Sequence, residues 1–211
     1  MPEQKCLICQ SETKDLSIAS RKFLHCQACL FTSLDPQHFL NTEDEKARYE
    51  LHENTIDNEG YVKMFEEFIA YAISPFQVNK VLDYGSGPEP VLTELLKRKG
   101  YQAESYDPFY AQNSFTANSF EMIVSTEVFE HFFDPLKEIE KVLSLLKTGG
   151  YLSIMTRFNP GPREFENWFY KNDPTHVSFY ALETFEFLAQ KYKLEILKQD
   201  SHKNIVFQKL L

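Results

Sequence analysis

The sequence lacks an excess of basic residues, a long apolar run and any cysteine beyond residue 29. Lysine and arginine number 22 against 31 aspartate and glutamate residues, a net charge of −9, so no basic surface is available for nucleic acid or an anionic membrane. No apolar run approaches the roughly 20 residues needed to cross a bilayer, and the polar N-terminus does not resemble an export signal. We therefore expect a cytoplasmic protein without a membrane partner, in a reducing compartment where cysteines are thiols.

The 211 residues are enough for one α/β domain and a small appendage. We expect a cysteine-bearing module at residues 1–40, a linker with an N-terminal helix at 41–77, and the main domain at 78–211. Residues 41–58 are acidic and polar, whereas residues 60–73 place apolar side chains three and four positions apart and predict an amphipathic helix.

All four cysteines lie in two Cys-x-x-Cys pairs, Cys6 with Cys9 and Cys26 with Cys29, and sixteen residues separate the pairs. This pattern is typical of a zinc ribbon, in which two knuckles hold a tetrahedral Zn²⁺. Iron or a redox pair is the alternative. Four thiolate ligands leave no open position, so the zinc should be structural. Between the pairs, residues 16–24 predict a strand and residues 13–15 a turn.

From residue 78 the sequence alternates between short apolar runs and amphipathic segments. This alternation predicts an α/β fold with a doubly wound, mostly parallel sheet. The predicted helices are 90–99, a helix that begins at Asp134 and is ended by Gly149-Gly150, and 182–191. The predicted strands are 80–83, 101–106, 120–125 and 151–156, followed by a hairpin of 194–198 and 205–208.

A glycine-rich turn follows the first strand, in the segment Asp83-Tyr84-Gly85-Ser86-Gly87. Ligands bind such sheets at the carboxyl ends of the strands, where the strand order reverses. Asp107 stands at the end of the next strand, where a carboxylate can accept both hydroxyls of a ribose. A dinucleotide site needs a third glycine beside the pyrophosphate, and Glu89-Pro90 stands there instead. The expected ligand is therefore a nucleoside without phosphates.

Four segments in this order resemble the class I S-adenosylmethionine-dependent methyltransferases of the small-molecule branch. Residues 83–87 resemble their first motif, 106–108 their ribose-binding strand end, 120–131 their fourth-strand segment and 146–152 the turn into their fifth strand. The resemblance covers about residue 78 to the C-terminus and implies a Rossmann-like methyltransferase fold with S-adenosylmethionine as cofactor. It implies these cofactor-binding residues: Asp83, Tyr84, Gly85, Ser86, Gly87, Asp107, Pro108, Thr126, Glu127 and Tyr61.

The resemblance also implies roles for these residues. Gly85 and Gly87 would face the methionine part, Asp107 the ribose, and residues 126–127 the methyl group. Tyr61 would close over the cofactor from the N-terminal side, together with Tyr49 and His52. The cysteine module resembles one found on some sugar C-methyltransferases.

The segment between Asp107 and Phe120 departs from the family pattern. Its twelve residues are too few for the usual helix and third strand. We therefore expect a sheet that is trimmed at the third-strand edge, with the adenine resting near residues 110–116.

Two histidines are candidates for catalysis. A hydroxyl or acidic carbon acceptor must lose a proton, and His131, after the fourth strand, and His176, after the fifth, should open onto the same rim. If either is the base, the rate should fall below about pH 6.5. Four further residues are expected to shape the acceptor pocket: Arg157, Trp168, Tyr170 and Tyr180.

The sequence is compatible with three functions. The favoured one is methylation of a small-molecule acceptor at oxygen or carbon, for example a sugar or a secondary metabolite. An RNA methyltransferase that uses the zinc ribbon as a substrate clamp is the second, and the negative charge opposes it. The third is a catalytically silent, nucleoside-binding interaction module.

Overall fold

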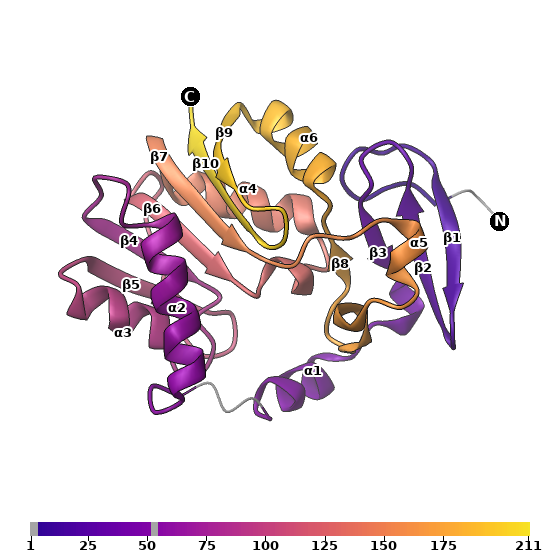
Figure 1. Cartoon of the computed structure of the whole chain (residues 1–211), viewed down its shortest axis with the longest axis horizontal. Coiled ribbons are helices and arrows are strands. Elements are labelled where there is room, and N and C mark those ends of the chain that lie inside the picture. Colours follow the sequence, from indigo (N-terminus) through magenta and orange to yellow (C-terminus); the bar gives the residue numbers. More distant parts are fainter. Residues whose placement is uncertain (1–3, 52–54) are drawn as a thin grey trace.

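The computed structural model describes residues 4–51 and 55–211, which form two β-sheets with helices packed around the larger one (Figure 1). The larger sheet has six strands in the order β5-β4-β6-β7-β10-β9. The smaller sheet has four, in the order β1-β2-β3-β8. In Figure 1 the strands β1, β2 and β3 lie beside the main domain, next to β8 and one end of α6.

In the larger sheet β5, β4, β6 and β7 are parallel, β10 runs antiparallel to β7, and β9 runs antiparallel to β10. Its strands are β4 (Lys80–Tyr84), β5 (Gln102–Tyr106), β6 (Phe120–Thr126), β7 (Leu146–Met155), β9 (Leu194–Gln199) and β10 (Asn204–Lys209). The predicted mostly parallel α/β sheet is confirmed. The chain passes from β4 outward to β5 and then to β6 on the other side of β4, so the strand order reverses at β4. In the described part of the chain no strand lies beyond β5.

Helices cover both faces of this sheet, because their apolar stripes need a partner surface. On one face α2 (Glu59–Ala72) and α3 (Val91–Arg98) pack against alternate strand residues such as Val81 and Val124. On the other face α4 (Pro135–Leu145) and α6 (Leu182–Tyr192) pack against the strand residues that point the other way, such as Leu82 and Ile123. The remaining helices of the described residues are η1 (Pro36–His38), α1 (Thr42–Tyr49), η2 (Phe129–His131), α5 (Pro162–Phe165) and η3 (Phe169–Asn172). None of the described helices is long and apolar enough to span a membrane.

The sequence predictions for two segments are wrong in detail. The predicted turn 13–15 and strand 16–24 lie instead in a hairpin of β1 (Thr13–Ile18) and β2 (Arg21–Cys26), which turns at Ala19 with φ of +50°. Neither glycine nor proline marks that turn. Gly149 and Gly150 do not end a helix, since α4 stops at Leu145 and both glycines lie inside β7. A Cβ atom on Gly150 would lie 2.9 Å from the Glu121 carbonyl oxygen, so close backbone approach requires the glycine.

The cysteine module shares its core with the main domain. Cys26, Cys29 and Phe31 belong to the same buried cluster as Tyr180 and Phe185. The strand β8 (Ser178–Phe179) pairs with β3 (Thr32–Leu34), and so the small sheet takes its fourth strand from the C-terminal part of the chain. The module is therefore held against the main domain by strand pairing and by apolar contact.

Candidate functional site

The glycine loop turns sharply at the end of β4. Gly85 and Ser86 both donate their backbone N–H to the Tyr106 carbonyl oxygen, at 2.7 and 3.1 Å. Gly85 has φ of +86°, and a Cβ atom there would lie 2.4 Å from Cγ2 of Val128. A Cβ on Gly87 would meet no atom within 4 Å. The loop is thus closed at Gly85 by Val128, two residues after the end of β6, and faces open space at Gly87.

Asp107 connects the end of β5 to this loop. Its Oδ2 atom accepts the Gly87 N–H at 2.9 Å, and its Oδ1 atom accepts the N–H groups of Phe109 and Tyr110 at 2.8 and 3.1 Å. The carboxylate is buried, while Pro108 is exposed. The two strand ends at the point of order reversal are therefore joined by one carboxylate.

Asp83 and Tyr84, the last residues of β4, point to opposite faces of the sheet. Asp83 accepts a hydrogen bond from the Thr93 hydroxyl at 2.9 Å, and complete burial raises the pKa of Asp83 to about 7. Tyr84 stacks on Tyr106 and donates to Glu138 on α4 at 2.6 Å, so its side chain belongs to the core beneath that helix. Tyr61 on α2 is half-buried, and burial together with Asp83 and Glu127 raises its pKa above the usual range.

Two carboxylates lie near the end of β6. Thr126 is the last residue of the strand, and Glu127 follows with φ of +55°, a conformation that L-residues rarely adopt. Burial, reinforced by the charge of Glu130, raises the pKa of Glu127 to about 8. The Tyr170 hydroxyl hydrogen-bonds to Glu130 Oε1 and lies 3.0 Å from Glu127 Oε2. Both carboxylates are therefore tied to one tyrosine at the carboxyl edge of the sheet.

The two predicted histidines meet beside these carboxylates. His131 is the last residue of η2, His176 lies between η3 and β8, and their ring centroids are 4.9 Å apart. His131 Nδ1 lies 3.0 Å from the Thr175 carbonyl oxygen, and His176 Nδ1 lies 2.7 Å from that of Tyr170. Burial lowers the pKa of His176, which favours the neutral imidazole. The predicted common rim is thus present.

The N-terminal helix α1 closes one side of this cluster. Tyr49 presents its ring to His131 at 5.2 Å and to Phe109 at 5.9 Å, and Arg48 forms an ion pair with Asp173 at 2.8 Å. His52, predicted to help cover the cofactor, lies outside the described residues. A hollow of about 330 Å³ opens next to the cluster, and it is lined by Arg48, Phe169, Tyr170, Asn172, Asp173 and His176.

Some residues of the acceptor side differ from what the sequence predicts. Tyr180 is fully buried and stacks on Phe185, so it is a core residue rather than a pocket wall. Arg157 lies over the Phe169 ring at 5.1 Å. Glu130 was not predicted as a site residue, although its place next to His131 and three residues after Glu127 could have indicated it.

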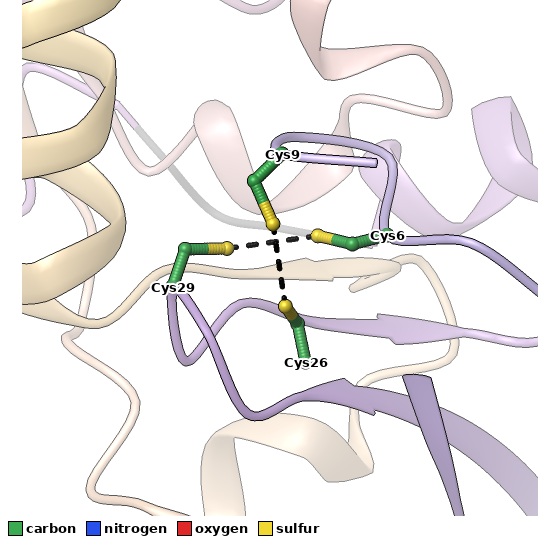
Figure 2. A group of neighbouring side chains, drawn as sticks. All are labelled: Cys6, Cys9, Cys26 and Cys29. Atoms are coloured by element: carbon green, nitrogen blue, oxygen red, sulfur yellow. Dashed lines mark hydrogen bonds between the residues drawn. The ribbon is translucent and has the colours of Figure 1, made fainter. Parts of the chain in front are cut away.

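The four cysteines form a compact group of thiols (Figure 2). The Sγ atoms of Cys6 and Cys29 are 3.6 Å apart and those of Cys9 and Cys26 are 3.4 Å apart; all four lie within 4.8 Å of one another. A tetrahedral zinc ion with bonds of about 2.3 Å would separate its sulfurs by about 3.8 Å. The cluster therefore has the donor set and nearly the spacing for zinc.

Comparison with known proteins identifies the family. The family model described as "Methyltransferase domain" matches residues 57–199. No protein of curated function matches the sequence.

Solved structures of similar fold include three from archaea. An S-adenosylmethionine-dependent methyltransferase from Archaeoglobus fulgidus is 16% identical with a TM-score of 0.54, and the match covers 72% of this chain and 94% of that one. A putative S-adenosylmethionine-dependent methyltransferase from Methanococcus maripaludis is 17% identical with a TM-score of 0.52, and the match covers 80% of this chain and 93% of that one. A chain in the complex of the Haloferax volcanii Trm112 methyltransferase activator with a putative methyltransferase is 12% identical with a TM-score of 0.53, and the match covers 80% of this chain and 98% of that one. With its family match, sheet order and glycine loop, this chain belongs to the methyltransferase domain family, as an S-adenosylmethionine-dependent enzyme.

Proposed function

We propose that this enzyme transfers the methyl group of S-adenosylmethionine to a small-molecule acceptor, at a hydroxyl oxygen or an acidic carbon. The observation that carries the proposal is the position of His131 and His176. Their rings are 4.9 Å apart, both lie next to Glu130, and His176 lines the hollow.

The donor would lie along the carboxyl ends of β4, β5 and β6. Gly85, Ser86 and Gly87 would face its methionine part, and Asp107 would accept the ribose hydroxyls. Its Oδ2 atom accepts only the Gly87 N–H and keeps a second lone pair, and its Oδ1 atom would exchange one of its two N–H partners for a hydroxyl. Thr126 and Glu127 would lie near the methyl group, with Tyr61 covering the donor from α2. Tyr110 is our candidate for a further contact with the nucleoside, because its buried hydroxyl has no hydrogen-bond partner in the described part of the chain.

Methyl transfer is an in-line displacement at the methyl carbon. The acceptor atom forms the new bond to carbon while the carbon–sulfur bond breaks, and the electron pair of the breaking bond goes to sulfur. Positioning supplies much of the acceleration. The acceptor must also give up its proton, and His131 and His176 are the residues that we propose to activate it.

The charge and size of the site favour a small acceptor. A hollow of about 330 Å³ lies at the lower end of the range for small-molecule pockets. The net charge of −9 repels polyanions such as RNA. An uncharged or cationic acceptor, such as a sugar or a secondary metabolite, is therefore the class that we propose.

The cysteine cluster would hold one structural Zn²⁺ ion. Cys6, Cys9, Cys26 and Cys29 would complete its tetrahedral coordination and leave no position for a substrate. All four are free thiols in the structure, which suits the cytoplasmic location that we propose.

The acceptor is tested by the release of S-adenosylhomocysteine. We expect release with members of a panel of hydroxylated small molecules, and roughly 10²–10⁴-fold lower turnover in His176→Gln or His131→Gln with unchanged affinity for the donor. Full turnover in both variants would remove the histidines from the proposal. Activity with RNA alone, falling steeply as salt rises, would instead identify the zinc module as a substrate clamp.

A further inference from the structure

We propose that Glu130, His131 and His176 bind a divalent transition-metal cation at the acceptor side of the active site. One potential ligand atom from each of the three residues lies within 4.8 Å of the other two. This site is separate from the cysteine cluster, and its donor set is different. The role that we assign to the cation rests on the proposed function, but its existence does not.

The two imidazoles are held as metal-ligating histidines are held. Each Nδ1 lies within hydrogen-bonding distance of a backbone carbonyl oxygen, that of Thr175 for His131 and that of Tyr170 for His176. A carbonyl can only accept, so Nδ1 carries the proton and the ring lone pair is on Nε2. Histidine ligands of metals generally donate their other ring N–H to such a group, which fixes the tautomer and the ring orientation.

The third ligand is a buried carboxylate that has no lysine or arginine partner among the described residues. Glu130 is 0% exposed, and its oxygens accept hydrogen bonds from the hydroxyls of Tyr170 and Thr156. In the described part of the chain, no lysine or arginine nitrogen lies within 4.0 Å of Glu130 or of the neighbouring Glu127. Buried carboxylates are normally paired with a cation or coordinate a metal. A bound cation would compensate the charge here.

The donor set selects the class of cation. Imidazole suits Zn²⁺, Fe²⁺ and Ni²⁺, and carboxylate suits Mn²⁺, whereas the four thiolates of the other cluster suit Zn²⁺. Ligands about 2.1 Å from a metal are roughly 3–3.5 Å apart, by the geometry of such sites. The ligand atoms now lie within 4.8 Å of one another, so each pair would have to close by at most about 1.3–1.8 Å around the ion. Two histidines and one carboxylate leave coordination positions open for water or a substrate oxygen.

The position of the site indicates which step of the reaction the cation would assist. His176 also lines the hollow in which we place the acceptor. An acceptor hydroxyl bound to the cation loses its proton to solvent more readily, because the metal stabilises the resulting alkoxide. The alkoxide then attacks the methyl carbon as the carbon–sulfur bond breaks. His131 and His176 thus activate the acceptor by holding the metal rather than by taking the proton.

The test measures metal binding without any acceptor. Protein with its cysteine cluster loaded with zinc is titrated with Mn²⁺, and electron paramagnetic resonance reports the free ion. We expect one Mn²⁺ site per chain in the wild type. His176→Gln, His131→Gln and Glu130→Gln should each weaken binding by at least about 10–100-fold. The matched control is His202→Gln, a change at an exposed histidine outside the cluster. Thermal melting and S-adenosylhomocysteine affinity show whether each variant is folded.

The outcomes separate this proposal from the proposed function. Mn²⁺ binding that is lost in folded His176→Gln or His131→Gln but kept in His202→Gln supports the metal site, even if no small molecule is methylated. Wild-type protein that takes up neither Mn²⁺ nor zinc beyond the cysteine cluster overturns it. Equal Mn²⁺ affinity in folded His176→Gln, His131→Gln and His202→Gln overturns it as well, whatever the acceptor proves to be.

Discussion

Replacing Asp107 with alanine should weaken the binding of S-adenosylhomocysteine by at least about 100-fold. We expect its carboxylate to accept both ribose hydroxyls. A hydrogen bond to a charged group contributes about 1.5–3 kcal/mol, so two of them contribute about 3–6 kcal/mol. Since about 1.4 kcal/mol changes an affinity tenfold, the smaller value already corresponds to about 100-fold.

The structure adds a second contribution to this loss. The same carboxylate accepts the N–H groups of Gly87, Phe109 and Tyr110, and these lose their acceptor in the alanine variant. The glycine loop should therefore become less ordered, which adds to the cost of binding. Asp107→Asn keeps one acceptor oxygen and should bind with intermediate affinity.

Isothermal titration calorimetry with S-adenosylhomocysteine measures the effect without turnover. Glu104→Gln is the matched control, because Glu104 lies on the same strand and its ion pair with Lys80 is exposed. Thermal melting of each variant separates loss of binding from loss of folding. A folded Asp107→Ala protein that binds within threefold of the wild type would refute the assignment of this strand end to the ribose.

Three further predictions concern metal, backbone and pH. Elemental analysis should find one zinc held by thiolates per chain, and a double change of Cys6 and Cys9 to serine should remove it and lower the melting temperature; retained zinc would contradict this. Gly85→Ala should destabilise the fold by about 2–5 kcal/mol in denaturant titration, from its positive φ and its overlap with Val128; adding Val128→Ala should recover only the steric part, and full recovery would exclude backbone strain. Burial raises the pKa of Asp83 to about 7, so ionising this carboxyl costs free energy in the folded protein. The stability of the ligand-free protein should therefore fall from pH 6 to pH 8, and Asp83→Asn should lessen that fall. Parallel pH profiles of the wild type and the variant would contradict this prediction.

The sequence by itself determined the class of the fold and the places of its chemistry. Alternating apolar runs and amphipathic segments have different periods for strands and helices, so the parallel sheet and its flanking helices could be predicted. The segment from Asp83 to Gly87 and the acidic residue at the next strand end could be placed for the same reason, since local order along the chain fixes which residues follow a strand.

Some turns and strand bounds could not be predicted from the sequence. The hairpin that turns at Ala19 and the strand that contains Gly149 and Gly150 depend on pairing with neighbouring strands, which local propensity does not encode. Tyr180 illustrates the same limit. An aromatic residue in a loop near the site can line a pocket or fill the core, and contact with Phe31 and Phe185 decides for the core.

Only the tertiary structure brought the acceptor side together. His131 and His176 come from different loops, and His176 is positioned by the pairing of β8 with β3 of the cysteine module and by the hydrogen bond from Val177 to the Glu130 carbonyl oxygen. Arg48 reaches Asp173 from a helix more than a hundred residues earlier in the chain. Such contacts depend on how the two sheets are packed against each other, and residue spacing along the sequence carries no direct information about that packing.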